Sequence, residues 1–266
     1  MRGKYRHMKI KIGNSILNYI EIEPEKLASE STVLLFLHEA LGSIRQWKTF
    51  PQQLCNQLGL KGIVYERQGH GDSAPFTSER DENYLHNYAF NELPVFIESV
   101  VPSDKQILLI GHSDGGTISL LYASKYPNRI SGIVTMAAHV INEAETIAGI
   151  QPAVDAYELG KLDGLKKYHG DKTKDLFFAW ANIWRDDRFL NWDITEEIGS
   201  NLPSLFIQGK DDQYGTAKQL ELIQSRFENG TSLLLDECGH HPHLEKQNEV
   251  ILAIFKFFSN LSFQNR

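Results

Sequence analysis

A serine between two glycines is the first candidate for chemistry in this sequence. Residues 107–118 run from an apolar segment through Gly111-His112-Ser113-Asp114-Gly115 into a stretch of small residues. A strand, a tight turn and a helix in this order hold a serine in strained backbone geometry, and the glycines keep other side chains off its hydroxyl. We therefore predict that Ser113 is a nucleophile. The same pattern also fits an ordinary glycine-rich connection between a strand and a helix.

A serine hydroxyl needs a neighbouring base, which in turn needs a carboxylate to orient it. The sequence offers Asp211 and Asp212 directly after one later apolar segment, and His240 directly after the next. Loops that follow parallel strands open at the same edge of a sheet. On such sheets the nucleophilic serine, the acid and the histidine of a catalytic triad can follow one another along the chain in this order. We predict that Ser113, one of the two aspartates and His240 form a catalytic triad.

The remaining pattern predicts the sheet that this arrangement requires. Residues 8–22 alternate as two strands joined at Gly13-Asn14. Six further apolar segments are expected to be buried strands, at 32–37, 62–65, 107–110, 130–136, 205–208 and 232–235. Helical patterns occur between and after them, among others at 84–100, 216–227 and 245–258. The prediction is an α/β fold, a mostly parallel eight-stranded sheet with helices on both faces.

The alternation of strands and helices stops after residue 138. Residues 139–201, here called the cap segment, show no strand pattern and contain many aromatic residues. We expect a helical insertion that folds over the carboxyl ends of the strands, with 1–138 and 202–266 forming the core domain. Most of its aromatic residues should pack the insertion onto the core. His139, Trp184 and Trp192 are predicted to line a substrate pocket.

Composition narrows the classes of function. The chain has 266 residues, 41% of them hydrophobic, and a formal net charge of −7 without a long basic run. Nucleic-acid and membrane partners are therefore not expected, and a small-molecule substrate is. The first residues lead into a strand pattern rather than a signal peptide, and two cysteines are too few for a disulfide framework. We expect a cytoplasmic protein, and the sequence leaves open whether it forms a homodimer.

These features resemble the α/β-hydrolase fold family over nearly the whole chain, with the cap segment as its cap domain. In that family the acid commonly lies in a G-x-x-D loop, which matches residues 209–212 and favours Asp212. The histidine lies in a G-H-x-P context, which favours His240. His241 and His243 are then expected in solvent or at the rim of the site. The spacing of the three histidines His240, His241 and His243 suits one metal centre poorly, and the triad explains the site without a metal, so none is expected. No cofactor is expected either.

The resemblance also implies an oxyanion hole of two backbone N–H groups. One would come from Asp114 and the other, by the family's H-G-x motif, from Ala40, with Leu41 as the alternative. Here the sequence departs from the family, because Glu39 stands where glycine is usual. A carboxylate pointing inward would repel an oxyanion. We expect it to turn away and pair with a cation, Arg67 being a candidate.

Further positions bear on structure and specificity. Glu66 and Gln68 replace the Asp and Arg of the family's D-x-R-G-x-G-x-S loop, which should affect loop packing rather than catalysis. The Asp114 side chain either bonds to local structure or recognises a cationic group, since similar hydrolases with S-D-G-G at this turn include some that act on amino-acid esters. Cys238 is expected to be a small buried residue.

The predicted function is that of a cofactor-independent serine hydrolase, which cleaves a carboxylic ester of a small soluble molecule through an acyl-enzyme on Ser113. Carbon-carbon bond or thioester hydrolysis on the same triad is an alternative, because fold and triad do not fix the leaving group. A non-catalytic ligand receptor is a second alternative. Dehalogenation and epoxide hydrolysis would need a carboxylate at position 113. An interfacial lipase would need an apolar lid, whereas the cap segment is strongly charged.

Overall fold

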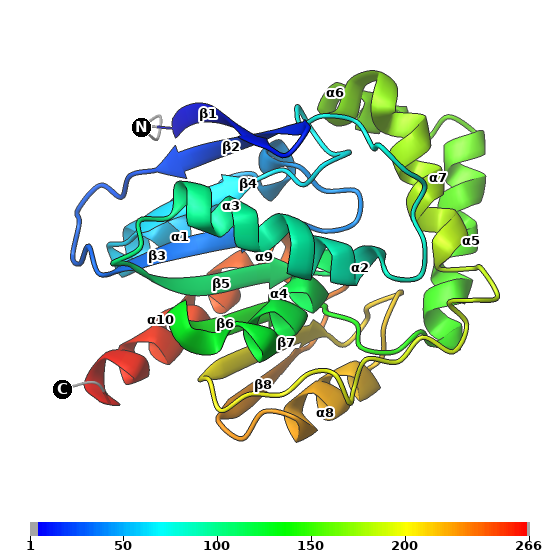
Figure 1. Cartoon of the computed structure of the whole chain (residues 1–266). Coiled ribbons are helices and arrows are strands. Elements are labelled where there is room, and N and C mark those ends of the chain that lie inside the picture. The colour runs from blue at the N-terminus through cyan, green and yellow to red at the C-terminus, as the bar shows by residue number, and fades with distance from the viewer. Residues whose placement is uncertain (1–4, 265–266) are drawn as a thin grey trace.

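One eight-stranded sheet runs through the molecule (Figure 1). This computed structural model describes residues 5–264, so residues 1–4 of the basic N-terminal segment and 265–266 lie outside the described part. The strands are β1 (Tyr5–Ile12), β2 (Ser15–Ile22), β3 (Thr32–Leu37), β4 (Lys61–Tyr65), β5 (Gln106–His112), β6 (Ile130–Met136), β7 (Ser204–Gly209) and β8 (Gly230–Leu235). Their order is β1-β2-β4-β3-β5-β6-β7-β8. Only the β1–β2 and β2–β4 pairs are antiparallel, which confirms the predicted mostly parallel sheet.

The sheet separates two hydrophobic cores. All six residues of β3 are buried, and Leu35 faces one core while Phe36 faces the other, as the two-residue period of a strand requires. One core contains side chains of α3 (Leu93–Val100), α4 (Asp114–Lys125) and α8 (Ala217–Ser225). The other contains side chains of α1 (Phe50–Leu58) and α10 (Gln247–Gln264). Helices therefore cover both faces of the sheet.

The helical stretch predicted at 84–100 is interrupted. It consists of α2 (Tyr84–Asn87), the π-helical turn η2 (Tyr88–Glu92) and α3. Pro94 lies in the first turn of α3. Because proline has no N–H to donate, the regular hydrogen-bond ladder cannot continue through this position. The segment nevertheless stays helical over its predicted length.

Between β6 and β7 the chain contains no strand, only a single bridge that joins Ile141 to Asp193. Its helices are α5 (Ala144–Glu158), α6 (Lys166–His169) and α7 (Thr173–Ile183), with the short turns η4 (Asp163–Leu165) and η5 (Gly170–Lys172) between them. Figure 1 shows α5, α6 and α7 together at one end of the sheet, far from the C-terminal helix α10. No helix of the described residues is long and apolar enough to cross a membrane.

Shorter elements complete the chain. They are η1 (Ile44–Trp47), η3 (Pro127–Arg129) and α9 (Pro242–Glu245). η1 and α9 follow the loops after β3 and β8, and those loops carry Glu39 and His240. The loops after β3, β5, β7 and β8 all leave the carboxyl ends of parallel strands, which places them at one edge of the sheet.

Candidate active site

Ser113 occupies a sharp turn between β5 and α4. Its backbone has φ 51° and ψ −121°, a conformation that non-glycine residues rarely adopt. The backbone approaches itself closely on either side of the serine: a Cβ on Gly115 would lie 2.0 Å from the Leu37 carbonyl oxygen, and one on Gly111 would lie 2.3 Å from the carbonyl oxygen of Gly115. Only glycine fits at either position. The local sequence thus holds the serine in a strained turn.

His240 lies between Ser113 and Asp212. Its Nε2 is 3.0 Å from the Ser113 hydroxyl oxygen, and its Nδ1 is 2.9 Å from both carboxylate oxygens of Asp212. The carboxylate also accepts hydrogen bonds from the Gln208 side-chain amide (2.6 Å) and the Tyr214 backbone N–H (2.9 Å). Burial would raise the pKa of Asp212, but the facing His240 and the hydrogen bond from the Tyr214 N–H lower it below its ordinary value. An ionised carboxylate therefore orients the imidazole, and the structure places Asp212 rather than the exposed Asp211 in contact with it.

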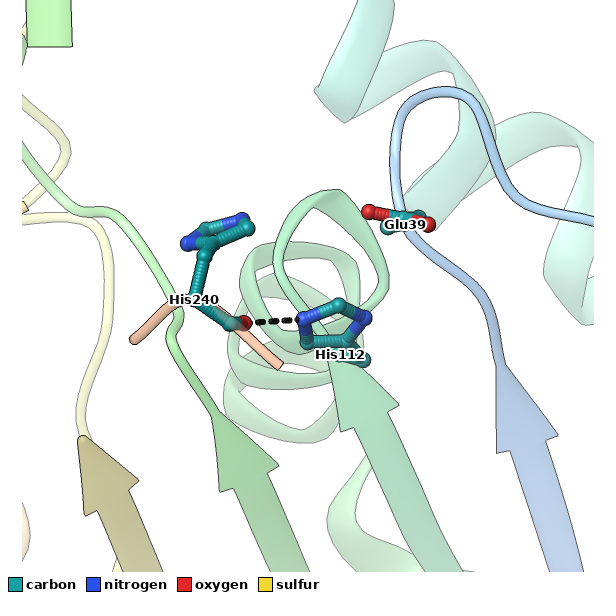
Figure 2. Close-up of side chains that lie close together, drawn as sticks. All are labelled: Glu39, His112 and His240. Atoms are coloured by element: carbon teal, nitrogen blue, oxygen red, sulfur yellow. Dashed lines mark hydrogen bonds between the residues drawn. The ribbon is translucent and has the colours of Figure 1, made fainter. Parts of the chain in front are cut away.

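His112 supports the loop that carries His240. Its Nε2 donates a hydrogen bond of 2.7 Å to the His240 backbone carbonyl (Figure 2). Burial lowers the pKa of His112 to about 3, so the ring is neutral and its single proton is fixed in that bond. Cys238, in the same loop, is a buried free thiol, as predicted.

Buried donors hold the backbone of the loop after β3 from behind. Arg67, which is fully buried, donates to the carbonyls of His38 (2.5 Å) and Glu39 (2.8 Å), and His38 Nδ1 donates to the Glu39 carbonyl at 2.7 Å. In a trans peptide the N–H points opposite to the carbonyl of the same unit. The Ala40 N–H therefore points away from Arg67, and no acceptor for it lies among residues 5–264. Ala40 lines the cavity at Ser113.

The next two carbonyls of this loop face the rings of two buried histidines. His70 Nε2 lies 3.0 Å from the Ala40 carbonyl, and His169 Nε2 lies 2.9 Å from the Leu41 carbonyl. His169 belongs to α6 of the cap segment and also accepts the Gly71 backbone N–H at Nδ1, at 3.0 Å. The cap segment is thus hydrogen-bonded to the loop that carries Ala40. The N–H of Asp114 opens α4, where helical amides have no partner within their own helix.

The side chain of Glu39 corrects our expectation. It does not pair with Arg67, because the Arg67 guanidinium bonds to backbone carbonyls, and it does not turn away from the site. It forms an ion pair with His241, with 3.2 Å between a carboxylate oxygen and Nε2. Burial works against both charges, but the attraction of His241 holds the pKa of Glu39 well below its ordinary value, and Glu39 raises the pKa of His241 to about 9. At neutral pH the pair carries no net charge.

Glu39, His112 and His240 lie close together (Figure 2). One possible metal-ligand atom of each lies within 4.8 Å of those of the other two. A glutamate and two histidines are ligands that zinc uses. Here, however, both ring nitrogens of His240 contact Asp212 and Ser113, and His112 Nε2 donates to a carbonyl. A metal would have to displace the hydroxyl of Ser113 from His240. We therefore assign these donors to the hydrogen-bond network.

A cavity of about 630 Å³ opens above Ser113. Its apolar wall comes from the cap segment and includes Ile150, Ala153, Leu162, Leu165, Phe177 and Trp180. The opposite end is polar and contains Glu39, Ser113, Asp114, His240 and His241. His139 and Trp184 also line the cavity, and His139 Nε2 donates to the Tyr214 carbonyl at 2.9 Å.

Two predicted positions differ from the structure. Trp192 does not line this cavity; it stacks on Phe189 with 4.9 Å between ring centroids and lies behind Trp184. His243 does not lie in solvent or at the rim, because α9 turns it into the core, where its ring lies 4.7 Å from that of Trp47. Burial lowers its pKa well below the ordinary value, so it is neutral. His241 stays partly exposed at the cavity, where a rim residue was expected.

The carboxylate of Asp114 bonds to a residue distant in sequence. The Tyr84 hydroxyl lies 3.1 Å from both of its oxygens and accepts a 2.9 Å hydrogen bond from the indole N–H of Trp184. The side chain therefore does not bond to its own turn. Within the described chain it forms no ion pair with a lysine or arginine.

The loop after β4 bears out the predicted structural role of its unusual residues. Glu66 is buried and accepts hydrogen bonds from the Asn18 side chain (2.9 Å) and from the backbone N–H groups of Ile44 (3.0 Å) and Asp72 (2.7 Å). It thereby ties three segments together. Gln68 bonds only within its own loop and to neighbouring helices.

The model of the alpha/beta hydrolase fold family matches residues 32–165. The bifunctional biotin biosynthesis protein BioHC of Teredinibacter turnerae is 25% identical over 91% of this chain, which spans only 47% of that protein. A putative esterase/lipase of Haemophilus influenzae is 23% identical over 95% of this chain and 91% of its own. The solved structure of a serine hydrolase involved in carbazole degradation, the CarC enzyme, superimposes with a TM-score of 0.73 at 18% identity, covering 96% of this chain and 99% of that one.

Proposed function

The chain belongs to the α/β hydrolase fold family, and from this premise we propose that it is a serine hydrolase that cleaves a carboxylic ester of a small molecule through an acyl-enzyme on Ser113. The observation that carries the proposal is the position of His240, with one ring nitrogen 3.0 Å from the serine hydroxyl and the other 2.9 Å from Asp212. A base oriented by an ionised carboxylate is what a serine hydroxyl needs to become a nucleophile.

In the proposed reaction the Ser113 oxygen attacks the ester carbonyl while its proton passes to His240 Nε2. The negative charge that develops on the carbonyl oxygen is stabilised by the N–H groups of Ala40 and Asp114. His240 then protonates the leaving alcohol as the ester bond breaks, and the acyl group stays on the serine. Asp212 keeps the imidazole in the required tautomer and stabilises its cation.

The cavity supports a small, partly apolar ester as the substrate. Its volume of about 630 Å³ is within the usual range for small-molecule sites, and its apolar wall offers no charged partner. The similar Haemophilus protein is named a putative esterase/lipase, which agrees with this substrate class. We propose that the apolar part of the substrate contacts the cap segment and that the ester lies at the polar end, beside Ser113.

The proposal is tested by measuring hydrolysis of short- and medium-chain nitrophenyl esters by the wild type and by Ser113→Ala. We expect turnover by the wild type, loss of turnover in the variant, and labelling of Ser113 by a fluorophosphonate. Labelling without ester turnover would redirect the search to thioesters or carbon-carbon bonds. Absence of labelling would refute the nucleophile and leave the ligand receptor as the function to test.

Amino-acid esters are a second candidate substrate class, favoured by the side chain of Asp114. It belongs to a residue that lines the cavity next to the nucleophile, and among the described residues its hydrogen-bond partner is a neutral hydroxyl. The nearby Arg80 interacts electrostatically with this carboxylate without forming an ion pair, so a substrate ammonium group would be its direct charged partner. Esters of alanine with a free and with an acetylated amine distinguish the two classes: a preference for the free amine that disappears in Asp114→Asn supports this candidate, and equal turnover refutes it.

A further inference from the structure

Glu39 carries one carboxylate oxygen that the protein does not use. Oε2 pairs with His241 at 3.2 Å, whereas Oε1 has no hydrogen-bond partner within residues 5–264. The side chain is 19% exposed, and the residue lines the cavity at Ser113. The ion pair fixes the direction of the carboxylate and also cancels its charge toward the neighbouring oxyanion hole. An ionised acceptor is thus held at the nucleophile without an uncompensated charge.

The position of this carboxylate relative to His240 suits one bridging water. One of its oxygens lies within 4.8 Å of a ring nitrogen of His240. Nδ1 of His240 is held by Asp212, so the ring nitrogen available at the nucleophile is Nε2, which contacts the Ser113 hydroxyl. Two atoms that share a water with ordinary bond lengths and a tetrahedral angle lie about 4.6 Å apart.

We propose that Glu39 is a further catalytic residue, which together with His240 binds the water that hydrolyses the acyl-enzyme. This inference rests on the proposed function. One hydrogen of the water bonds to His240 Nε2 and the other to the Glu39 carboxylate, so that a lone pair of the oxygen is directed at the acyl carbonyl. Glycine, the residue that the family resemblance predicts at this position, could not supply that acceptor.

The step is balanced with the groups present. The water oxygen forms a bond to the acyl carbon, and its proton moves to His240 Nε2. The resulting intermediate collapses as the bond from carbon to the Ser113 oxygen breaks, and His240 returns the proton to that oxygen. The second hydrogen of the water stays on the product acid and keeps its hydrogen bond to Glu39. No other reactant is needed.

This geometry also predicts which acceptor receives the acyl group. Water has two hydrogens and can satisfy His240 and Glu39 together, whereas an alcohol has one hydroxyl hydrogen and must leave one of them unsatisfied. The site should therefore favour hydrolysis over transfer to alcohols. A hydrogen bond to a charged acceptor contributes enough to change such a ratio by about 10- to 100-fold.

Stopped-flow kinetics with nitrophenyl acetate in the presence of methanol test the inference on wild type and Glu39→Ala. We expect the nitrophenol burst of the variant to keep its rate, while steady-state turnover in methanol-free buffer falls about 10- to 100-fold because hydrolysis of the acyl-enzyme slows. Intact-mass measurement should show acetylated Ser113 accumulating. The ratio of methyl acetate to acetate should rise by the same factor. Equal losses in burst rate and turnover, or an unchanged product ratio, would overturn the inference.

Three control variants distinguish a bound water at Glu39 from effects of charge, of the ion pair or of misfolding. Glu196→Ala removes an equivalent charge from a side chain that is 84% exposed, and it should leave the product ratio unchanged. His241→Gln removes the positive charge but keeps a side-chain donor that can orient Glu39; a ratio changed as in Glu39→Ala would overturn the inference in favour of the charge of the pair. Glu39→Gln, nearly identical in shape, replaces Glu39→Ala if that variant does not fold.

If wild type forms no adduct on Ser113, the proposed function itself fails, whereas an adduct with an unchanged ratio of methyl acetate to acetate overturns the inference alone.

Discussion

Raising the pH should weaken the ion pair between Glu39 and His241 and so destabilise the folded protein. The pKa of His241 in the folded state is about 9, against an ordinary value of 6.5. A raised pKa in the folded state means that the stabilisation is complete below pH 6.5 and is lost as the pH rises through about 9. Glu39, whose pKa is lowered, stays ionised over this whole interval.

The magnitude follows from the difference between the two pKa values of His241. It corresponds to about 3.4 kcal/mol at most, because each tenfold change in proton affinity is worth about 1.4 kcal/mol. The side chain of His241 is 36% exposed, so screening by solvent reduces this figure. We expect the pair to contribute about 1–2 kcal/mol to the free energy of unfolding at pH 6.5, and little at pH 10.

Urea denaturation of wild type and Glu39→Gln at pH 6.5 and pH 10 measures this contribution. Other titrating groups affect both proteins alike, so the difference between the two proteins reports the pair. That difference should shrink by about 1–2 kcal/mol at the higher pH. His241→Gln should show the same loss, and the double variant should lose no more than either single one. A difference that is the same at both pH values would refute the ion pair.

Three further predictions concern the catalytic groups and the turn that carries the nucleophile. Asp212→Asn should reduce turnover about 10³- to 10⁴-fold by disturbing the imidazole tautomer, measured by steady-state kinetics against an unchanged melting temperature. His169→Ala should lower kcat about tenfold with little change in KM, because the Leu41 carbonyl loses its hydrogen-bond donor. His169→Gln keeps a donor and should restore part of the lost activity. Gly115→Ala should prevent stable folding, since its Cβ would lie 2.0 Å from the Leu37 carbonyl oxygen; native circular dichroism in this variant would contradict that contact.

The positions that depend on chain order could be predicted from the sequence. Ser113, Asp212 and His240 each follow a parallel strand, and parallel strands end at one edge, so their meeting needs only the order of the elements. The strands themselves could be predicted because burial on both faces leaves continuous apolar runs, as in β3.

Side-chain directions in loops could not be predicted, because loops have no periodicity to show which face is buried. Glu39 and His241 lie on the loops after β3 and β8, and nothing local in either loop indicates that they meet. His243 is one residue past the start of a short helix whose packing decides its burial. The contact between His169 and the Leu41 carbonyl joins segments far apart in the chain, and neither segment carries a signal for it.

The backbone of the loop after β3 is held entirely by groups outside the Glu39 side chain. Arg67, His70 and His169 position its carbonyls, and through the peptide planes they orient its N–H groups. Selection can therefore replace the side chain at position 39 without moving the neighbouring amides. Position 39 is therefore a place where natural variation or directed evolution can alter the preferred acyl acceptor while the geometry of the other catalytic groups stays the same.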